Sequence, residues 1–484
     1  MLIRHTLLYL PAQVLAPAIA LVTILVWAYL LPTSDVGMAT LVVAAQEISY
    51  TIFYLWWSHF ALRHLPRFRR EGVHHFLQTE TPAIALAVLV QIAVFAPLAF
   101  FYFPGIGVGT VLSITIYVVT RSLLRYFAER ARSDTCIGLY TLIQVGGPAI
   151  GLALNFLLVP IYGAHASVVL AGFSIGQAIV VLIGIIKSDF GREAIRPRRA
   201  ILREATSFGG PIALANSQAM IALNAPRFIV DWTLGLAAAG QFAVSYGLGM
   251  RAASFATMLV TAGAFPLVVK RMETEGLAAA YAQLRQNILL VATVLLPVGF
   301  GLFALTHSTV DTILPPQFRE TAYWVLPLAT IGGMLRSMRF DTTDQVFQIR
   351  SRTLFISFLG ACDLVICCIL AWVGAMQFGA TGAVLGPLFA AIVSFIASQL
   401  LARLVLDFSF PTGDVLRVTL AAAVMAGFVS LVPNTHKLPI LIGIVIGGAI
   451  IYIVALAAFL PAGYRQQVFR MMGKFRRSSK PVGD

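Results

Sequence analysis

The chain has 484 residues, of which 59% are hydrophobic and only 11% are charged, and its mean hydropathy is +0.87. Soluble domains carry about 25% charged residues, so this composition excludes an ordinary soluble protein and predicts an all-α polytopic membrane protein. The formal net charge of +14 suits loops that face anionic lipid headgroups. Nucleic-acid binding would need a basic folded surface with aromatic platforms, which the sequence does not contain.

About fourteen hydrophobic runs follow one another, each long enough to cross about 30 Å of hydrocarbon as a helix. We expect spanning helices at about 7–31, 37–60, 82–103, 108–128, 138–160, 165–186, 206–230, 237–266, 286–306, 321–346, 353–374, 380–404, 415–432 and 438–460. The first run is too long for the core of a cleavable signal peptide and has no clear small-residue cleavage site. We therefore expect it to be the first spanning helix.

Basic residues gather in every second connection between these runs. They are Arg63, Arg67, Arg69, Arg70, Arg130, Arg132, Lys187, Arg192, Arg196, Arg198, Arg199, Arg203, Lys270, Arg271, Arg350 and Arg352, and six more occupy the C-terminal tail. The alternate connections carry only Arg319 and Lys437. The positive-inside rule therefore predicts an even number of spans with both termini in the cytoplasm.

Three short motifs occur twice in the same order. Arg336 follows Arg121 by 215 residues, Arg350 follows Arg132 by 218, and the Phe378 turn follows the Tyr162 turn by 216. Nearly constant offsets predict duplicated halves, and duplicated halves in a membrane chain are typical of transporters. We expect two pseudo-symmetric six-helix lobes at 1–204 and 205–406, two extra helices at 407–463 and a basic cytoplasmic tail at 464–484.

The first hairpins of the two lobes align when Gly37 is set against Gly240. Glu47 then lies opposite Met250, one residue from the equivalent of Arg251. Glu47 and Arg251 both lie about ten residues into their helices, near the middle of the membrane, where ionisable groups usually face a protein interior or a watery cavity. The pair is either a substrate-binding element of a cavity or a structural ion pair.

Four further arginines form two pairs, each one helical turn apart, at matching places in the two halves. They are Arg121, Arg125, Arg336 and Arg339. Arginine binds phosphate oxygens through its fork and stays charged in a low dielectric, so these residues predict a cationic entrance for a diphosphate. The alternatives are snorkelling to headgroups and structural pairing with Glu129 or with Asp341 and Asp344.

Asp363 is alone in the middle of its span, and it is either an ion-coupling carboxylate or a buried neutral carboxyl. Arg227 and Asp231 lie one turn apart near the outer end of their span and predict an i,i+4 ion pair. Neither the four cysteines nor the His74–His75 pair has metal-ligand spacing, so no metal site and no cofactor is expected.

Several turns resemble those of a known family. Leu31–Gly37 looks like a first periplasmic turn, and Asn224–Val230 resembles the hairpin between spans 7 and 8, although Pro226 replaces the acid that often precedes the arginine. The turns at Tyr162 and Phe378 look like those before spans 6 and 12. With its fourteen-helix layout, the chain resembles the polysaccharide transporters and lipid-linked oligosaccharide flippases of the multidrug/oligosaccharidyl-lipid/polysaccharide (MOP) exporter superfamily.

The resemblance implies a flippase of the bacterial cytoplasmic (inner) membrane that moves an undecaprenyl-diphosphate-linked oligosaccharide by alternating access. The cargo would be an O-antigen, capsule or exopolysaccharide repeat unit, and polysaccharide polymerase and chain-length proteins would be partners. Arg251, Glu47, the four paired arginines and Arg227 would bind substrate.

Three alternatives stay open. A multidrug or metabolite antiporter is disfavoured for cationic drugs by the density of positive charge. A peptidoglycan-precursor flippase shares the fourteen-helix layout. A membrane-embedded polymerase or ligase would need a catalytic periplasmic loop, and the longest one, about 307–320, is short and has no clear acid–base set, so the chain is not expected to be an enzyme.

Overall fold

The structure, a computed structural model, describes residues 2–352 and 354–459; the side chains of residues 2–11 and 258–263 are not described. The predicted basic tail at 464–484 lies outside the described residues. Within them the secondary structure is helical and contains no strand, which confirms the all-α prediction. The helices are α1 (Leu2–Leu30), α2 (Thr33–Phe53), α3 (Leu55–Glu71), α4 (His74–Tyr102), α5 (Val108–Ser133), α6 (Ile137–Thr141), η1 (Leu142–Gly146), α7 (Gly147–Tyr162), α8 (Ala166–Lys187), α9 (Arg199–Leu234), α10 (Leu236–Glu275), α11 (Leu277–Ala304), α12 (Thr306–Ile313), α13 (Pro316–Met338), η2 (Arg339–Thr343), α14 (Asp344–Ile349), α15 (Leu354–Ala383), α16 (Leu385–Leu406), α17 (Thr412–Ser430) and α18 (Leu438–Phe459).

Eleven helices of the described part are long and apolar enough to span a membrane, which makes the chain a multi-pass membrane protein. The other three predicted spans fall on α9, α10 and α13. The total of fourteen therefore stays a prediction. The expected break between the spans at 353–374 and 380–404 is present, because Gly379 leaves the helical conformation with φ 66° and ψ −154°.

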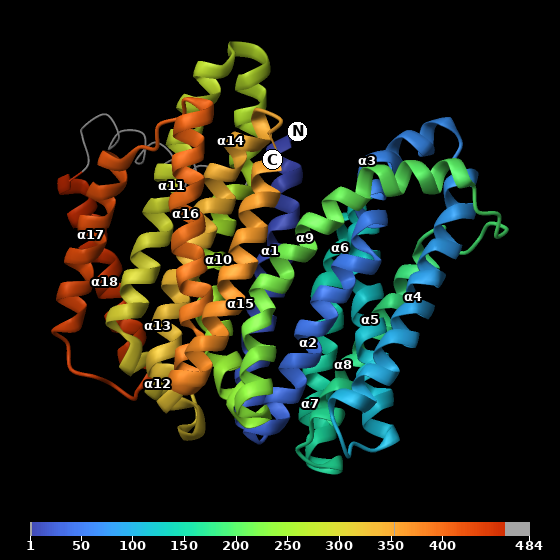
Figure 1. Cartoon of the computed structure of the whole chain (residues 1–484), viewed down its shortest axis with the longest axis horizontal. Helices are drawn as coiled ribbons and strands as arrows, with labels where there is room; N and C mark the ends of the chain where they lie inside the picture. Colours follow the sequence, from blue (N-terminus) through green and yellow to red (C-terminus); the bar gives the residue numbers. More distant parts are fainter. Residues whose placement is uncertain (1, 353, 460–484) are drawn as a thin grey trace, which may run out of the picture. The chain divides into compact units, whose positions relative to one another are not determined.

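The chain divides into two compact units. Unit 1 contains Met1–Arg251, Leu314–Ala329 and Leu354–Ser394, and unit 2 contains Ala252–Ile313, Thr330–Thr353 and Phe395–Asp484. In unit 1, α5 packs against α2, α3, α4 and α8, and α7 packs along α8 (Figure 1). In unit 2, α11 packs against α17 and α18 around a mainly apolar cavity of about 410 Å³. The predicted lobes at 1–204 and 205–406 stay a proposal.

Two clusters of ion pairs connect helices of unit 1. Glu80 on α4 is fully buried, and both Arg130 and Tyr126 of α5 donate hydrogen bonds to its carboxylate. Arg69 at the end of α3 donates to Asp134 and, at 2.5 Å, to Asp189. The hydrogen bond from Arg69 lowers the pKa of the Asp189 carboxyl, which lies in the loop after α8.

The start of α2 crosses the start of α10 at two glycines. A Cβ on Gly37 would overlap the carbonyl oxygen of Leu236, and a Cβ on Gly240 would overlap that of Thr33. Each overlapped carbonyl belongs to the residue four positions before the opposite glycine, so the contact is reciprocal. Gly37 and Gly240 are the two positions that the sequence alignment of the lobes sets against each other. Reciprocal contact is the arrangement expected of two equivalent helices related by a two-fold rotation.

Two adjacent glycines of α9 provide a test of helix packing. A Cβ on Gly209 would overlap the backbone carbonyl of Trp56 on α3, whereas a Cβ on Gly210 has no atom within 4 Å. We expect Gly209→Ala to destabilise the protein by about 1–3 kcal/mol, because a backbone neighbour cannot rotate away. We expect Gly210→Ala to be neutral or stabilising by up to about 1 kcal/mol. Thermal unfolding in detergent measures both, and equal effects of the two substitutions would contradict this packing.

Candidate functional site

Five ionisable residues on four helices of unit 1 form the arginine cluster. Glu47 comes from α2, Arg121 and Arg125 from α5, Arg227 from α9 and Arg251 from α10. Arg125 is exposed, and the other four are half-buried. All four guanidinium groups interact electrostatically with the carboxylate of Glu47. The cluster thus has four positive charges and one negative charge in a chain whose helices are mostly apolar, and such an excess attracts anions.

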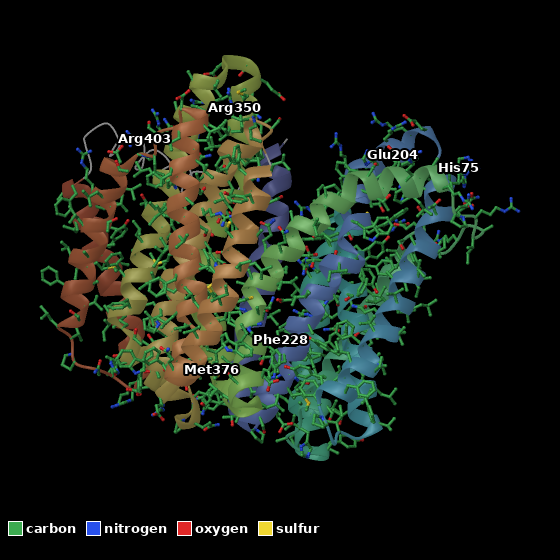
Figure 2. All side chains as sticks on the ribbon, in the orientation of Figure 1. His75, Glu204, Phe228, Arg350, Met376 and Arg403 are labelled. Carbon is green, nitrogen blue, oxygen red and sulfur yellow. The ribbon has the colours of Figure 1, made fainter. Side chains whose placement is uncertain are left out.

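Asn224 connects the only acid of the cluster to one of its arginines. This buried residue of α9 donates from Nδ2 to Oε2 of Glu47 at 3.4 Å. Its Oδ1 accepts a hydrogen bond of 2.9 Å from Nη1 of Arg227. The guanidinium of Arg227 also lies over the ring of Tyr246, 5.9 Å from its centroid. Figure 2 labels the neighbouring residue Phe228, which marks this part of α9.

Arg251 is held by a backbone carbonyl rather than by an acid. Its Nη1 donates to the carbonyl oxygen of Ala20 on α1 at 2.6 Å. No ion pair of the described residues joins Arg251 to Glu47, although their charges interact. Of the two expected arrangements, the direct structural ion pair is therefore not formed.

Arg121 and Arg125 both contact other helices of unit 1. Nε of Arg121 donates to Oε1 of Gln46 on α2 at 3.0 Å. Arg125 lies over the ring of Tyr50 on α2, 4.5 Å from the centroid. One amide contact thus holds Arg121 against α2, and one aromatic contact holds Arg125 there. Snorkelling to headgroups is the alternative arrangement for these side chains.

The expected i,i+4 ion pair between Arg227 and Asp231 is not formed. Arg227 binds Asn224 instead, and Asp231 accepts a hydrogen bond of 2.6 Å from the hydroxyl of Tyr102 at the end of α4. The prediction was wrong because it considered only neighbours on the same helix. A buried amide and a tyrosine from another helix satisfy the two charges separately.

Arg336 and Arg339 belong to unit 2. Arg339 is only 1% exposed and forms an ion pair of 3.4 Å with Asp344, one of the two structural partners considered from the sequence. Its guanidinium also lies 5.0 Å from the ring centroid of Phe340. Arg336 is buried on α13. The roles of both residues in binding substrate stay a proposal.

Asp363 lies in unit 1 on α15, and the residue is 4% exposed. The hydroxyl of Ser394 on α16 donates to Oδ1 at 3.3 Å. One turn earlier on α15, Gly360 faces the amide oxygen of Gln218 on α9, and that buried oxygen accepts no hydrogen bond within the described part of the chain. The described residues contain no group of three or more His, Cys, Asp or Glu side chains that could hold a metal ion.

Sequence reasoning missed the neutral members of the site, chiefly Gln46, Gln91 and Asn224. All three are buried inside helices. The signal was available, because an amide inside a hydrophobic span is costly unless it is hydrogen-bonded. Charge alone cannot identify the uncharged groups that orient charged ones.

Comparison with known proteins gives a family and a fold. The family described as "Polysaccharide biosynthesis protein" matches residues 78–323. No curated protein is significantly similar to the chain.

Among solved structures, the lipid II flippase MurJ in an inward closed conformation is 12% identical, with a TM-score of 0.75, and the match covers 96% of this chain and 100% of that one. An inward-facing multidrug resistance MATE family transporter of the MOP superfamily is 13% identical, with a TM-score of 0.63 over 82% of this chain and 97% of that one. An outward-facing MATE transporter is 12% identical, with a TM-score of 0.56 over 84% of this chain and 95% of that one. At these identities the likeness establishes the fold.

Proposed function

The chain belongs to the family of polysaccharide biosynthesis proteins, and from this premise we propose that it is a flippase for a lipid-linked oligosaccharide in the bacterial cytoplasmic membrane. Its fold is that of MOP superfamily transporters. The observation that carries the proposal is the arginine cluster, where four guanidinium groups interact electrostatically with a single carboxylate. A diphosphate supplies the negative charge that this cluster lacks, and arginine forks bind phosphate oxygens in pairs.

The proposed cargo is an undecaprenyl-diphosphate-linked repeat unit of O-antigen, capsule or exopolysaccharide. The substrate site would open alternately to the two sides of the membrane as the lobes rock, and both termini would lie in the cytoplasm. The diphosphate would contact Arg121, Arg125, Arg227 and Arg251 of the arginine cluster. A role of Arg336 and Arg339 of unit 2 in binding substrate is a separate proposal. Polysaccharide polymerase and chain-length proteins would use the exported units.

A peptidoglycan-precursor flippase is the second candidate, because the fold likeness includes a lipid II flippase. Both cargoes carry a diphosphate on a polyprenyl chain, so the arginine cluster suits either. The family match favours polysaccharide repeat units.

The experiment that separates the two is a deletion strain. We expect lipid-linked repeat units to accumulate on the cytoplasmic leaflet and the surface polysaccharide to disappear while cell-wall synthesis continues. A strain that keeps its polysaccharide, or a gene that replaces an essential lipid II flippase, would reject polysaccharide export as the function.

We also propose that Asp363 couples transport to an ion gradient. Its carboxylate is buried between α15 and α16, and a neutral amide at this position keeps the shape but loses the charge. We expect Asp363→Asn to reduce export by about tenfold or more, because coupling requires a carboxylate that binds and releases a cation. The half-buried carboxylate Asp414, paired with Arg417, provides the control Asp414→Asn. Equal export in Asp363→Asn and wild type would remove Asp363 from the coupling mechanism.

A further inference from the structure

We propose that Gln46 is a positioning residue that fixes the guanidinium of Arg121 for the diphosphate of the substrate. This inference rests on the proposed function and deepens it, because it assigns the orientation of one phosphate-binding arginine to a neutral amide beside Glu47. Gln46 is 1% exposed. It acts through Arg121 and not on the substrate itself.

The side chain of Gln46 holds two consecutive residues of α5. Its Oε1 accepts the hydrogen bond from Nε of Arg121 at 3.0 Å. Its Nε2 donates to Oγ of Ser122, also at 3.0 Å. One amide on α2 therefore fixes both Nε of the Arg121 guanidinium and the side chain of Ser122, the next residue of α5.

A second buried amide, Gln91, contacts the same serine as Gln46. Nε2 of Gln91 donates to Oγ of Ser122 at 3.0 Å and to Oγ of Ser49 at 2.8 Å. Its oxygen accepts the hydroxyl of Tyr54 at 3.0 Å. All of these side chains are buried. Since a guanidinium can only donate, reversal of the Gln46 amide would place its NH₂ group against Nε–H of Arg121, whereas the hydroxyl groups around Gln91 can donate or accept.

In this network the oxygen of Gln46 must face Arg121. A guanidinium can bind an anion side-on, through Nε and one terminal nitrogen, or end-on, through Nη1 and Nη2. Gln46 occupies Nε, so two oxygens of a phosphoryl group would bind through Nη1 and Nη2, on a guanidinium that also lies 5.9 Å from the ring centroid of Tyr117.

The choice of glutamine rather than glutamate has an electrostatic consequence. A neutral amide accepts the Nε–H bond without cancelling the charge of Arg121. A carboxylate at the same position would hold the same atom and neutralise the guanidinium. The adjacent residues therefore have different roles: Glu47 supplies the negative charge of the cluster, and Gln46 supplies orientation without charge.

The binding test uses the purified full-length protein in detergent and farnesyl diphosphate as the probe, with affinity measured by calorimetry. We expect Gln46→Met to bind about tenfold more weakly, the size expected for misplacing one charged hydrogen-bond donor. The double variant Gln46→Met/Arg121→Ala should bind no more weakly than Arg121→Ala alone. Additive losses, or unchanged affinity in Gln46→Met, would overturn the proposal.

A matched control lies on α8, against the residue of α5 that precedes Arg121. Gln177 is also a buried glutamine, and it accepts a hydrogen bond of 2.9 Å from Thr120, the residue before Arg121. Gln177→Met removes the same chemical group next to α5 without touching Arg121. We expect this variant to keep wild-type affinity for the probe; a loss equal to that of Gln46→Met would assign the effect to packing and overturn the proposal.

A second measurement does not depend on the probe. Hydrogen exchange of the Arg121 Nε–H, observed by NMR on ¹⁵N-arginine protein, should be about tenfold or more slower than that of the exposed Arg125. Protection should persist in Gln46→Glu, which keeps the acceptor. Fast exchange in the wild type would overturn the proposal while leaving the flippase function in place. Slow exchange in a protein that does not bind farnesyl diphosphate would instead reject diphosphate recognition and keep the contact.

Discussion

Replacing Arg251 by alanine is expected to abolish export of lipid-linked repeat units while the protein still inserts in the membrane. The substitution removes one of four positive charges of the arginine cluster and the hydrogen bond from α10 to the Ala20 carbonyl on α1. Truncating a charged donor in a low-dielectric site reduces binding by about tenfold to more than a hundredfold. Arg251→Lys should rescue export only in part, because an ammonium group cannot replace the fork.

The measurement compares the amount of repeat units at the cell surface with the abundance of the protein in the membrane. Arg271→Ala is the matched control, since Arg271 also lies on α10 and is outside the arginine cluster. Export at the wild-type level in Arg251→Ala would remove this residue from the proposed substrate site. A parallel loss of membrane protein would assign the defect to stability.

Enlarging Gly37 is expected to give the second large effect. Even a methyl group at this position overlaps the backbone carbonyl of Leu236, so α2 and α10 must separate at their starts. We expect Gly37→Ala to destabilise the protein by about 1–3 kcal/mol and Gly37→Val by more, with a matching loss of export. Gly240→Ala should have an effect of the same size, because its contact is the reciprocal one.

Gly443 supplies the control for this series. It lies inside α18, and a Cβ there meets no atom within 4 Å. The Gly443→Ala and Gly443→Val variants should therefore unfold at nearly the same temperature as the wild type. Wild-type unfolding temperature and wild-type export in Gly37→Ala and Gly37→Val would show that the starts of α2 and α10 are not tightly packed in the working protein.

Hydropathy predicted the apolar parts of the helices and missed the polar ones. The expected span at 37–60 joins two helices that the structure separates at Tyr54, and α3 continues to Glu71 as an amphipathic helix with buried Trp57 and Phe60. Basic residues on one face of α3, including Arg67, lower its average hydropathy, so a hydropathy profile does not identify this helix. The same limit applies to α9, which begins at Arg199, because helix formation continues beyond the apolar run.

The candidate site was predictable in its charges but not in its contacts. Burial cost alone identifies Glu47 and Arg251 as residues that face the interior. The choice of partner depends on which helices become neighbours, and the sequence does not contain this information in a local pattern. Arg339 therefore binds Asp344 five residues away, while Arg121 binds Gln46 on another helix, although the two arginines belong to similar motifs.

The reciprocal crossing of α2 and α10 also limits how these two positions can change over evolutionary time. In most packed cores, a larger side chain on one element can be accommodated by a smaller one on the other, so paired positions drift together. Gly37 and Gly240 each face a main-chain carbonyl, and no substitution can make a carbonyl smaller. A larger side chain at Gly37 cannot be compensated by a change at Gly240, and the reverse is also true. Each position is constrained separately by the carbonyl that it faces. Two positions that the alignment of the predicted lobes pairs can thus stay identical without any coupling between their side chains.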